Sequence, residues 1–560
     1  MQPPHSLSRH QWLLAGLAVA IVWTTWFSGA GQLGLVGPDE PRYVSIARAM
    51  VESGDWVTPR LNGEPWFEKP VLYYWGAAAA FSVFGESEVS ARLPSAVAML
   101  VASAALMALA LRALGSSAAL ALAFMLPSML ATIAFARGAS TDMVFTATLT
   151  LAFAAAARVM EVLHASTSGL GGVGRSRERL LWLAAWGAAL GLAVLAKGPA
   201  AVLLAGGSVV LCSLVMRQWR WPLTFAHPVA LAAFALVAIP WYVLCALRNP
   251  DFVRVFILEH NVQRFLTPVF AHEQPWWYFG AVLVAGLVPW TTVLVPTLRN
   301  AWRDADSRRD PVALLAICWA IVPFVFFSVS RSKLPGYILP MFPPLALLMA
   351  RTMAASLEAP GRGRALLASS GGLLVVVAGL LAGMTTQVVP AQLTQAVATL
   401  GLTTTWPAAI GAAGIGIALL ALRGREWLAL GLTSTVMAIL VIGVNSRIVP
   451  ALDPHLSARA TAVAAIEAAS VATEGEPIFE FGLERTMDFG LDYYLRRDVP
   501  VWSPEAGEGV VVVRATTART FAASGYLVEV VKRISTDAVI TRVRRVDTVR
   551  LSTFSPPSTN

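Results

Sequence analysis

Gly37-Pro-Asp-Glu-Pro-Arg-Tyr-Val-Ser-Ile-Ala-Arg48 and Phe67-Glu-Lys-Pro-Val-Leu-Tyr-Tyr-Trp75 are the most informative segments of this 560-residue chain. They lie between two long apolar runs, and together with the residues between them they concentrate charges in a chain that is only 13% charged. Ionisable groups are costly near hydrocarbon, so a charged cluster held against apolar helices indicates a functional site. We therefore predict that the chemistry of this protein takes place at this loop, and that most of the remaining chain is scaffold.

Long apolar runs make up most of that scaffold, and hydrophobic residues account for 56% of the chain. A helix of about 20 apolar residues crosses a bilayer, and a backbone in hydrocarbon satisfies its hydrogen bonds internally only as a helix or a closed barrel. The predicted fold class is therefore mostly α, a polytopic helical membrane protein with about 13 transmembrane helices. The predicted spans are Trp12–Gly29, Ser90–Leu111, Ala118–Phe135, Val144–Leu163, Leu180–Leu195, Ala200–Met216, Phe225–Leu247, Trp276–Val295, Val312–Phe327, Tyr337–Ala350, Ala365–Met384, Trp406–Ala421 and Trp427–Val444.

The distribution of basic residues predicts the orientation, because cytoplasmic loops carry an excess of Lys and Arg. The loops on the side of the N-terminus hold most of the arginines: Arg9, Arg112, Arg158–Arg179, Arg217, Arg220, Arg299, Arg303, Arg308, Arg309, Arg351, Arg362, Arg364, Arg423 and Arg425. The opposite short loops hold only Arg137, Lys197, Arg331 and Lys333. We therefore expect a cytoplasmic N-terminus and, after an odd number of crossings, a C-terminal domain outside. The net charge of +9 reflects this asymmetry, and no basic cluster on one folded face indicates nucleic-acid binding.

Two features of the N-terminal region could change this topology. Val71–Phe84 is apolar but only about 14 residues long, which is short for a span, so we place it in the membrane interface, where Tyr and Trp are favoured. If it crossed, all later basic loops would move outside. Small residues near Gly29 would also fit a cleaved signal peptide, although the apolar run continues beyond the usual core of such a signal.

The sequence predicts three regions. Residues 1–447 form the transmembrane domain, with outer loops 30–89, 248–275 and 328–336. Residues 448–550 form a small α/β domain, and residues 551–560 a disordered tail rich in Ser, Thr and Pro. Within the second region, strands are predicted from Val, Ile, Phe and Tyr enrichment and helices from apolar periodicity. The predicted helices are Ser457–Ala472 and Glu484–Leu495, and the predicted strands are Pro477–Phe481, Gly509–Val513, Tyr526–Arg533 and Ala538–Val543.

Four cations stand at span ends or in the outer loops: Lys69, Lys197, Arg254 and Lys333. A cation at headgroup depth favours a permanent anion, and a lipid phosphate supplies one. Each of them taken alone could equally snorkel to ordinary headgroups. Carboxylates on the same side favour the functional interpretation, because snorkelling does not explain why both signs of charge gather at one face.

The carboxylates of interest are Asp39, Glu40 and Asp142, all at predicted helix starts. Acidic residues there stabilise a helix by about 0.5–1 kcal/mol, so capping is a sufficient alternative for each of them alone. Glu68 and His260 are candidates for a metal site, but their spacing matches no metal-binding template, so no metal and no other cofactor is predicted.

These motifs resemble those of the polyprenyl-phosphate-dependent glycosyltransferases of the GT-C architecture. The resemblance is carried by Asp39-Glu-Pro-Arg-Tyr43, Phe67-Glu-Lys-Pro-Val-Leu-Tyr-Tyr-Trp75, Thr141-Asp-Met143, Leu195-Ala-Lys-Gly-Pro199 and Ser332-Lys-Leu-Pro-Gly-Tyr-Ile-Leu-Pro340. More narrowly, the chain is similar over nearly its whole length to bacterial transferases that move 4-amino-4-deoxy-L-arabinose from undecaprenyl phosphate to lipid A. That resemblance implies a multi-pass protein of the bacterial inner membrane, with its active site and C-terminal domain in the periplasm and a role in polymyxin resistance.

The resemblance also implies roles for individual residues. Lys69 and Arg254 would hold the donor phosphate, assisted by Lys197 and Tyr337. Asp39 and Asp142 would be the catalytic carboxylates, with Asp39 beside the sugar. The further site candidates are Glu40, Arg42, Tyr43, Glu68 and Lys333.

The implied partners are the undecaprenyl phosphate-linked sugar, lipid A and membrane lipids, with no nucleic acid and no protein partner. Two alternatives remain open at this point. Transfer of mannose from a polyprenyl phosphate to protein hydroxyls would use a similar loop. A lipid or solute transporter would also carry charges in the membrane, but it should show them near the bilayer midplane and in inverted repeats.

Overall fold

The computed structural model describes residues 9–167, 173–263, 273–303, 310–359, 361–383, 400–470, 475–517, 526–535 and 538–545. Contacts between residues separate the chain into two compact units. Unit 1 contains residues 1–30, 47–60 and 64–444, and unit 2 contains residues 31–46, 61–63 and 445–560. The predicted tail at 551–560 lies outside the described residues.

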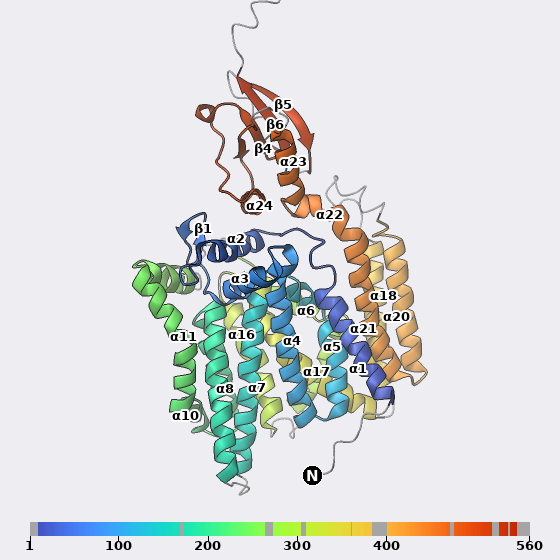
Figure 1. Ribbon diagram of the computed structural model, residues 1–560. Helices are drawn as coiled ribbons and strands as arrows, with labels where there is room; N and C mark the ends of the chain where they lie inside the picture. The colour runs from blue at the N-terminus through green and yellow to red at the C-terminus, as the bar shows by residue number, and fades with distance from the viewer. Residues whose placement is uncertain are drawn as a thin grey trace, which may run out of the picture. The chain divides into compact units, whose positions relative to one another are not determined.

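Unit 1 is a bundle of helices (Figure 1). Its elements are α1 (Arg9–Val22), η1 (Trp23–Phe27), α3 (Leu72–Phe84), α4 (Glu88–Ala113), α5 (Ser116–Ser128), α6 (Leu130–Ala136), α7 (Thr141–Thr167), α8 (Val173–Lys197), α9 (Ala200–Val215), α10 (Trp221–Phe225), α11 (Pro228–Arg248), η2 (Arg254–Gln263), α13 (Tyr278–Gly286), α14 (Thr291–Arg303), α16 (Pro311–Val329), η3 (Pro335–Met341), α17 (Phe342–Glu358), α18 (Arg362–Ala382), α20 (Thr405–Leu422) and α21 (Glu426–Gly443). A short β1 (Arg60–Leu61) and β2 (Glu64–Pro65) pair in the first loop, and α2 (Asp39–Ser53) begins in unit 2 and ends in unit 1.

The prediction of a polytopic helical membrane protein is confirmed. Among the described residues, nine helices are long and apolar enough to cross a membrane, or eleven if α5–α6 and α13–α14, which bend sharply, each count as one span. Two further predicted spans appear as shorter apolar helices, Leu13–Phe27 and Ala200–Val215. The third short apolar helix is α3, which lies across the ends of its neighbours in Figure 1 rather than alongside them. That arrangement agrees with the interfacial position expected for Val71–Phe84.

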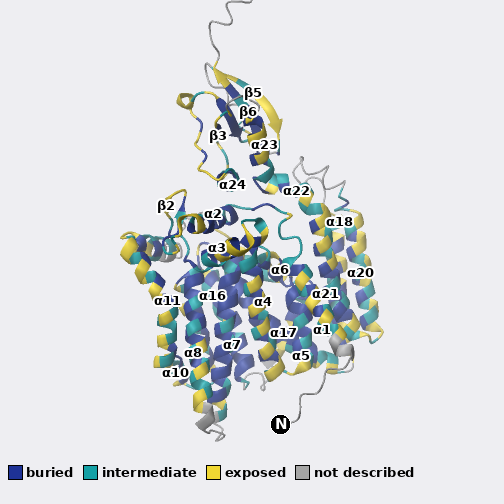
Figure 2. Ribbon diagram, in the orientation of Figure 1, coloured by how far each residue is buried: buried dark blue, intermediate teal, exposed yellow. Residues whose placement is uncertain are grey.

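The helices at the centre of the bundle are the most protected. Of the 18 most apolar consecutive residues of each helix, 89% are buried in α7 and in η3–α17. The corresponding share is 22% in α11 and 28% in α18 and in α20. Figure 2 shows the same contrast, with α7 mainly dark blue and α11 largely yellow and teal. A helix with a wide exposed apolar surface suits contact with lipid, whereas a buried one packs against protein. Polar side chains on α7 and η3 are therefore held by protein on most sides.

Unit 2 is a small α/β fold, as predicted. Its elements are η4 (Val444–Ile448), α22 (Val449–Leu456), α23 (Arg459–Ala469), β3 (Ile478–Phe481), α24 (Arg485–Leu495), η5 (Pro504–Ala506), β4 (Gly509–Val513), β5 (Tyr526–Arg533) and β6 (Val539–Arg545). The four strands lie in the order β3-β4-β6-β5, with β3 parallel to β4 and the other two pairs antiparallel. The predicted helix Ser457–Ala472 is shorter than expected, because the chain breaks between α22 and α23 at Ser457.

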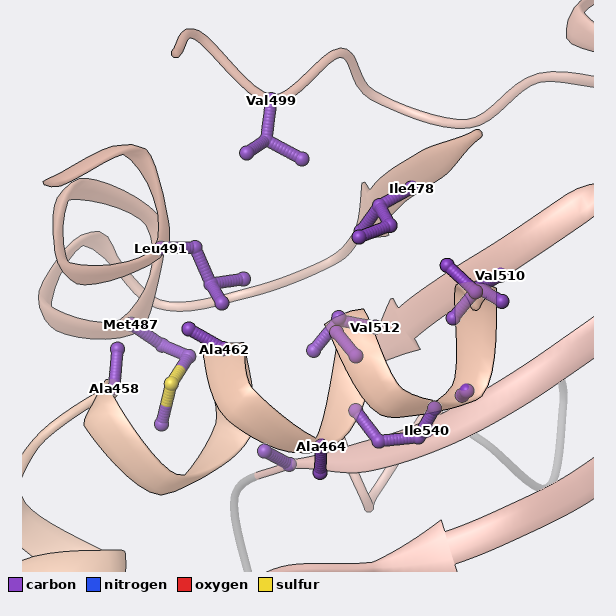
Figure 3. Close-up of a cluster of buried hydrophobic side chains, with 14 residues drawn as sticks. Ala458, Ala462, Ala464, Ile478, Met487, Leu491, Val499, Val510, Val512 and Ile540 are labelled. Atoms are coloured by element: carbon purple, nitrogen blue, oxygen red, sulfur yellow. The ribbon is translucent and has the colours of Figure 1, made fainter. Parts of the chain in front are cut away.

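The central strand β4 explains how this sheet is held together, since all five of its residues are buried. Successive side chains of a strand point to opposite faces. Val510 and Val512 join the core formed with α23 and α24, which Figure 3 shows, while Val511 and Val513 pack with Trp502 on the other face. A run of Val covered on both faces is therefore what this position requires.

The N-terminal part of the charged loop belongs to unit 2. Gly34 N donates to Asp453 Oδ1 at 2.7 Å, and Leu35 N donates to Tyr494 Oη at 2.9 Å. Asn62 Nδ2 donates to Asp492 Oδ2 at 2.9 Å. These bonds connect residues more than 400 positions apart. Gly34, Leu35 and Asn62 are therefore held in place by hydrogen bonds to the C-terminal part of the chain.

Candidate functional site

The centre of the bundle carries an ion pair between Lys197, the last residue of α8, and Asp142, in the first turn of α7. The two side chains are only 12% and 23% exposed. Helix capping, the alternative explanation for Asp142, is provided instead by Ser140, whose Oγ accepts from Asp142 N at 3.0 Å. The Asp142 carboxylate is thereby available to Lys197, and Lys69 also lies within electrostatic range of it.

The loop before η3 completes this cluster. The ring of Tyr337 lies below the Lys197 ammonium, with the nitrogen 4.8 Å from the ring centroid, a cation–π geometry. Gly336 packs directly against Asp142: a Cβ at this position would stand 2.6 Å from Asp142 Oδ2. A side chain at this position would therefore displace the Asp142 carboxylate. The structure brings together three sequence-predicted residues, Asp142, Lys197 and Tyr337, from three separate segments.

The Phe-Glu-Lys-Pro segment contributes a second pair, in which Lys69 Nζ donates to Glu68 Oε1 at 3.1 Å. Both side chains are largely buried. The neighbouring Phe67 packs edge to face on Phe252, with ring centroids 5.2 Å apart. Phe252 stands two residues before Arg254, so this contact brings the segments of Lys69 and Arg254 to the same end of the bundle.

Arg254 itself is the first residue of η2 and is exposed. Its guanidinium pairs with Asp251 at 3.0 Å and with Glu259. The hydrogen bond that Arg254 donates to Asp251, together with the negative charges of Glu259 and Asp251, raises the pKa of Arg254, which keeps the side chain cationic. The structure does not place Arg254 in contact with Lys69 or Lys197. The three cations predicted to hold the donor phosphate therefore belong to separate ion pairs.

Lys333 lies in the segment between α16 and η3 and is 7% exposed. Its Nζ donates to the carbonyl of Ser330 at 2.7 Å. The adjacent Ser332 is 3% exposed, and its hydroxyl has no hydrogen-bond partner among the described residues. This buried polar segment continues into Gly336 and Tyr337.

In unit 2, the acidic pair Asp39-Glu40 begins α2, as predicted. The side chain of Asp39 is 51% exposed and pairs with Arg42. Glu40 is buried and accepts from Val36 N at 2.9 Å, so it closes the turn before the helix. Arg42 is buried, and its guanidinium lies 5.6 Å from the ring of Tyr43 and 5.5 Å from that of Phe489 on α24. Asp39 is therefore the member of this group that presents a carboxylate to solvent.

Glu68 and His260, the two metal candidates, are not grouped with further possible metal ligands among the described residues. The part of the chain that the structure describes contains no group of three or more His, Cys, Asp or Glu side chains able to hold an ion. Sequence reasoning missed Ser140, Gly336 and Phe252. Gly336 lies within a motif already singled out and Ser140 immediately precedes another, but only the packing shows what they do.

Comparison with known proteins gives this geometry a context. Residues 12–256 match the family model of the dolichyl-phosphate-mannose-protein mannosyltransferases. The undecaprenyl phosphate-α-4-amino-4-deoxy-L-arabinose arabinosyl transferase of Pseudomonas aeruginosa (strain UCBPP-PA14) is 36% identical over 350 residues, which are 62% of this chain. The match spans 60% of that relative's length. The protein of the same name from Photorhabdus laumondii is 30% identical over 412 residues, 72% of this chain and 71% of the relative.

Among solved structures, ArnT from Cupriavidus metallidurans bound to undecaprenyl phosphate has the same fold. The TM-score is 0.77 over 98% of this chain and 100% of that one, at 24% sequence identity. The curated relatives confirm the resemblance inferred from the motifs, and this structure confirms the fold. Because a relative 30% identical matches over more than two thirds of both chains, this protein belongs to the family of undecaprenyl phosphate-α-4-amino-4-deoxy-L-arabinose arabinosyl transferases.

Proposed function

We propose that this protein transfers 4-amino-4-deoxy-L-arabinose from undecaprenyl phosphate to a phosphate of lipid A. The observation that supports this most directly is the cluster of Asp142, Lys197 and Tyr337 in the buried centre of a membrane bundle, with Lys69 close by. The names of the relatives support the choice of the sugar and of the donor lipid, whereas the acceptor lipid A is part of this proposal. The chain is a multi-pass membrane protein, and we place it in the bacterial inner membrane.

The proposed reaction is an inverting displacement at the anomeric carbon of the sugar. An oxygen of the lipid A phosphate attacks this carbon, the bond to the donor phosphate breaks, and its electron pair leaves on undecaprenyl phosphate. Negative charge therefore grows on the departing phosphate. Fixed cations near it stabilise the transition state more than the ground state, and removing one such contact typically costs about 3–4 kcal/mol.

In this proposal Lys69 and Arg254 hold the donor phosphate, and Lys197 supports them. The Asp142 carboxylate accepts from Lys197 and lies beside the Ser140 hydroxyl at 3.1 Å, so its oxygens are engaged. We therefore propose Asp142 as the residue that positions Lys197. Asp39, whose carboxylate is half exposed, would act on the sugar, where positive charge develops. A lipid A phosphate is already anionic, so the attack needs little help from a base.

The proposed topology follows the distribution of arginines. We place the N-terminus in the cytoplasm, the loops 30–89, 248–275 and 328–336 in the periplasm, and residues 448–550 in a periplasmic domain. Lys69 and Arg254 must then face the same side of the membrane. Labelling of single-cysteine variants at these positions with an impermeant reagent tests this arrangement, and labelling from opposite sides would refute it.

The activity is tested by mass spectrometry of lipid A from cells with and without the protein. We expect a mass increase of one aminopentose only when the protein is present. Lys69→Ala should abolish the increase, whereas Glu64→Ala, which removes an exposed charge from the same loop, should retain it. Unchanged lipid A combined with mannose on membrane proteins would instead support the protein mannosyltransferase suggested by the match to residues 12–256.

A further inference from the structure

The cations predicted at the site differ in what balances their charge. Four of them pair with carboxylates in the described part of the chain: Lys69 with Glu68, Lys197 with Asp142, Arg254 with Asp251 and Glu259, and Arg42 with Asp39. Lys333 is different, because the acceptor of its ammonium is the neutral carbonyl of Ser330. Nothing in the sequence separates Lys333 from Lys69, Lys197 and Arg254, the other cations singled out in the outer loops.

The burial of Lys333 makes this difference significant. A lysine ammonium has three donors, and at 7% exposure little water reaches this one. The hydroxyl of Ser332, at 3% exposure, has no hydrogen-bond partner among the described residues. Burying a charge without a counter-charge, or a hydroxyl without a partner, is costly, so native proteins rarely leave both side by side. An anion bound here would satisfy the two groups together.

The position of the segment indicates which anion. Three residues after Lys333, Gly336 packs on the Asp142 carboxylate, and the next residue, Tyr337, lies against the Lys197 ammonium. The segment is therefore part of the central cluster. The proposed reaction brings two lipid phosphates to this cluster, and the positive charge of Lys197 is already balanced by Asp142.

We propose that Lys333 and the Ser332 hydroxyl bind the anionic oxygens of a lipid phosphate. This inference rests on the proposed function, since it assigns a second phosphate-binding element to the same site. Either the undecaprenyl phosphate or the phosphate of lipid A supplies the same chemistry, and binding measurements distinguish the two sources.

A purely structural role for Lys333 makes the opposite prediction for stability. If the side chain serves only to brace the loop through Ser330, its removal lowers the thermal midpoint of the protein. If instead it is a buried charge kept for a ligand, an uncharged side chain of similar length should leave the ligand-free midpoint unchanged or raise it, since buried charges are often less stabilising than apolar replacements. Lys333→Met is the suitable variant, and Ser332→Ala tests the hydroxyl.

The experiment uses the full-length protein in nanodiscs of zwitterionic lipid. Equilibrium binding of undecaprenyl phosphate and of lipid A is measured separately, together with the thermal midpoint without either. Arg331→Gln is the matched control, since it removes an exposed cation from the same segment. We expect Lys333→Met to weaken the binding of one of the two lipids by about 10- to 100-fold, the range expected for loss of a hydrogen bond to a charged group.

The outcomes separate the possibilities. Weaker binding of undecaprenyl phosphate assigns Lys333 to the donor phosphate, and weaker binding of lipid A assigns it to the acceptor. Unchanged affinity for both lipids overturns the inference, as does a lower thermal midpoint with equally weakened binding of both. These binding measurements do not depend on turnover, so a wild-type protein that binds both lipids but transfers no aminopentose would refute the proposed function alone.

Discussion

Replacing Asp142 by Asn is the most informative single change to the central cluster. The substitution preserves size but removes the negative charge that balances Lys197, whose side chain is 12% exposed. Breaking a fully buried ion pair by removing one partner costs about 3–5 kcal/mol, whereas exposed pairs contribute about 0–1 kcal/mol. Because these side chains are 12% and 23% exposed, the cost should lie nearer the buried limit, at about 2–4 kcal/mol.

This cost can be measured as a shift in thermal midpoint in detergent. With an unfolding entropy of about 2 cal/mol/K per residue, a unit of about 400 residues shifts by roughly 1 °C per kcal/mol. Asp142→Asn should therefore lower the midpoint by about 2–4 °C. The double variant Asp142→Asn/Lys197→Met removes both charges and should recover most of this loss. Compared with the single variants Asp142→Asn and Lys197→Met, it should give a coupling energy of at least about 2 kcal/mol.

A midpoint unchanged in Asp142→Asn would show that Lys197 does not need its carboxylate and would refute the argument from burial. A double variant that is less stable than either single one would have the same consequence. Transfer activity should be lost in all three variants, because each removes the Lys197 ammonium, the carboxylate that positions it, or both. Folding defects and loss of chemistry are thus distinguished by the recovery of stability without recovery of activity.

Three further predictions concern two neighbours of Asp142 and Lys197 in the central cluster and one carboxylate of unit 2. Gly336→Ala would place a methyl group 2.6 Å from the Asp142 carboxylate, so transfer should fall by at least about tenfold while expression is maintained. Tyr337→Leu removes the ring below Lys197 and should weaken undecaprenyl phosphate binding by about two- to thirtyfold, the effect of about 0.5–2 kcal/mol, whereas Tyr337→Phe should retain most of it. Burial and the nearby Asp488 raise the pKa of Glu480 to about 8, so its neutral form is favoured in folded unit 2. The contribution of the neutral form to the stability of folded unit 2 is complete below the ordinary glutamate pKa and is lost as pH rises through 8. Hydrogen exchange in β3 should therefore quicken from pH 5 to 9. Glu480→Gln should remove the part of this pH dependence that comes from Glu480.

Each of these predictions has its own control. Gly379→Ala, at a helical glycine with open space around the added carbon, should leave transfer unchanged. If it reduced transfer as much as Gly336→Ala, the steric argument would be wrong. For Tyr337, equal losses in the Phe and Leu variants would exclude a role for the ring face. For Glu480, a pH dependence that persists in the Gln variant, after correction for intrinsic exchange, would contradict the assignment.

Much of the fold could be predicted from the sequence because its signals are local. Apolar runs long enough to cross a bilayer specify helices, and Val-rich stretches such as Gly509–Val513 specify strands, so these elements appear where they were expected. The helix before the sheet was predicted too long, because the break at Ser457 depends on its hydrogen bond to Asp453 at 2.9 Å and on pairing with Val36. Such partners are invisible to local periodicity.

The sequence singled out candidate site residues but not their arrangement. Motifs singled out Asp142, Lys197 and Tyr337, which the structure brings together. They also singled out Glu40, whose carboxylate closes a turn, and Arg42, which is held between aromatic rings. A charge in a motif does not reveal its counter-charge, and the distinction between the paired Lys197 and the differently held Lys333 appears only once the partners are known.

The hydrogen bonds that join Gly34, Leu35 and Asn62 to the last quarter of the polypeptide have a consequence for biosynthesis. A ribosome completes the residues around Asp39 long before Asp453 and Tyr494 exist, so this segment emerges without the groups that order it. Contacts of such long sequence separation form late, because the closure of a long loop must come first. A nonsense mutation before residue 445 would thus leave Gly34, Leu35 and Asn62 without these hydrogen-bond partners, so the ordering of this early segment depends on synthesis of the C-terminal residues.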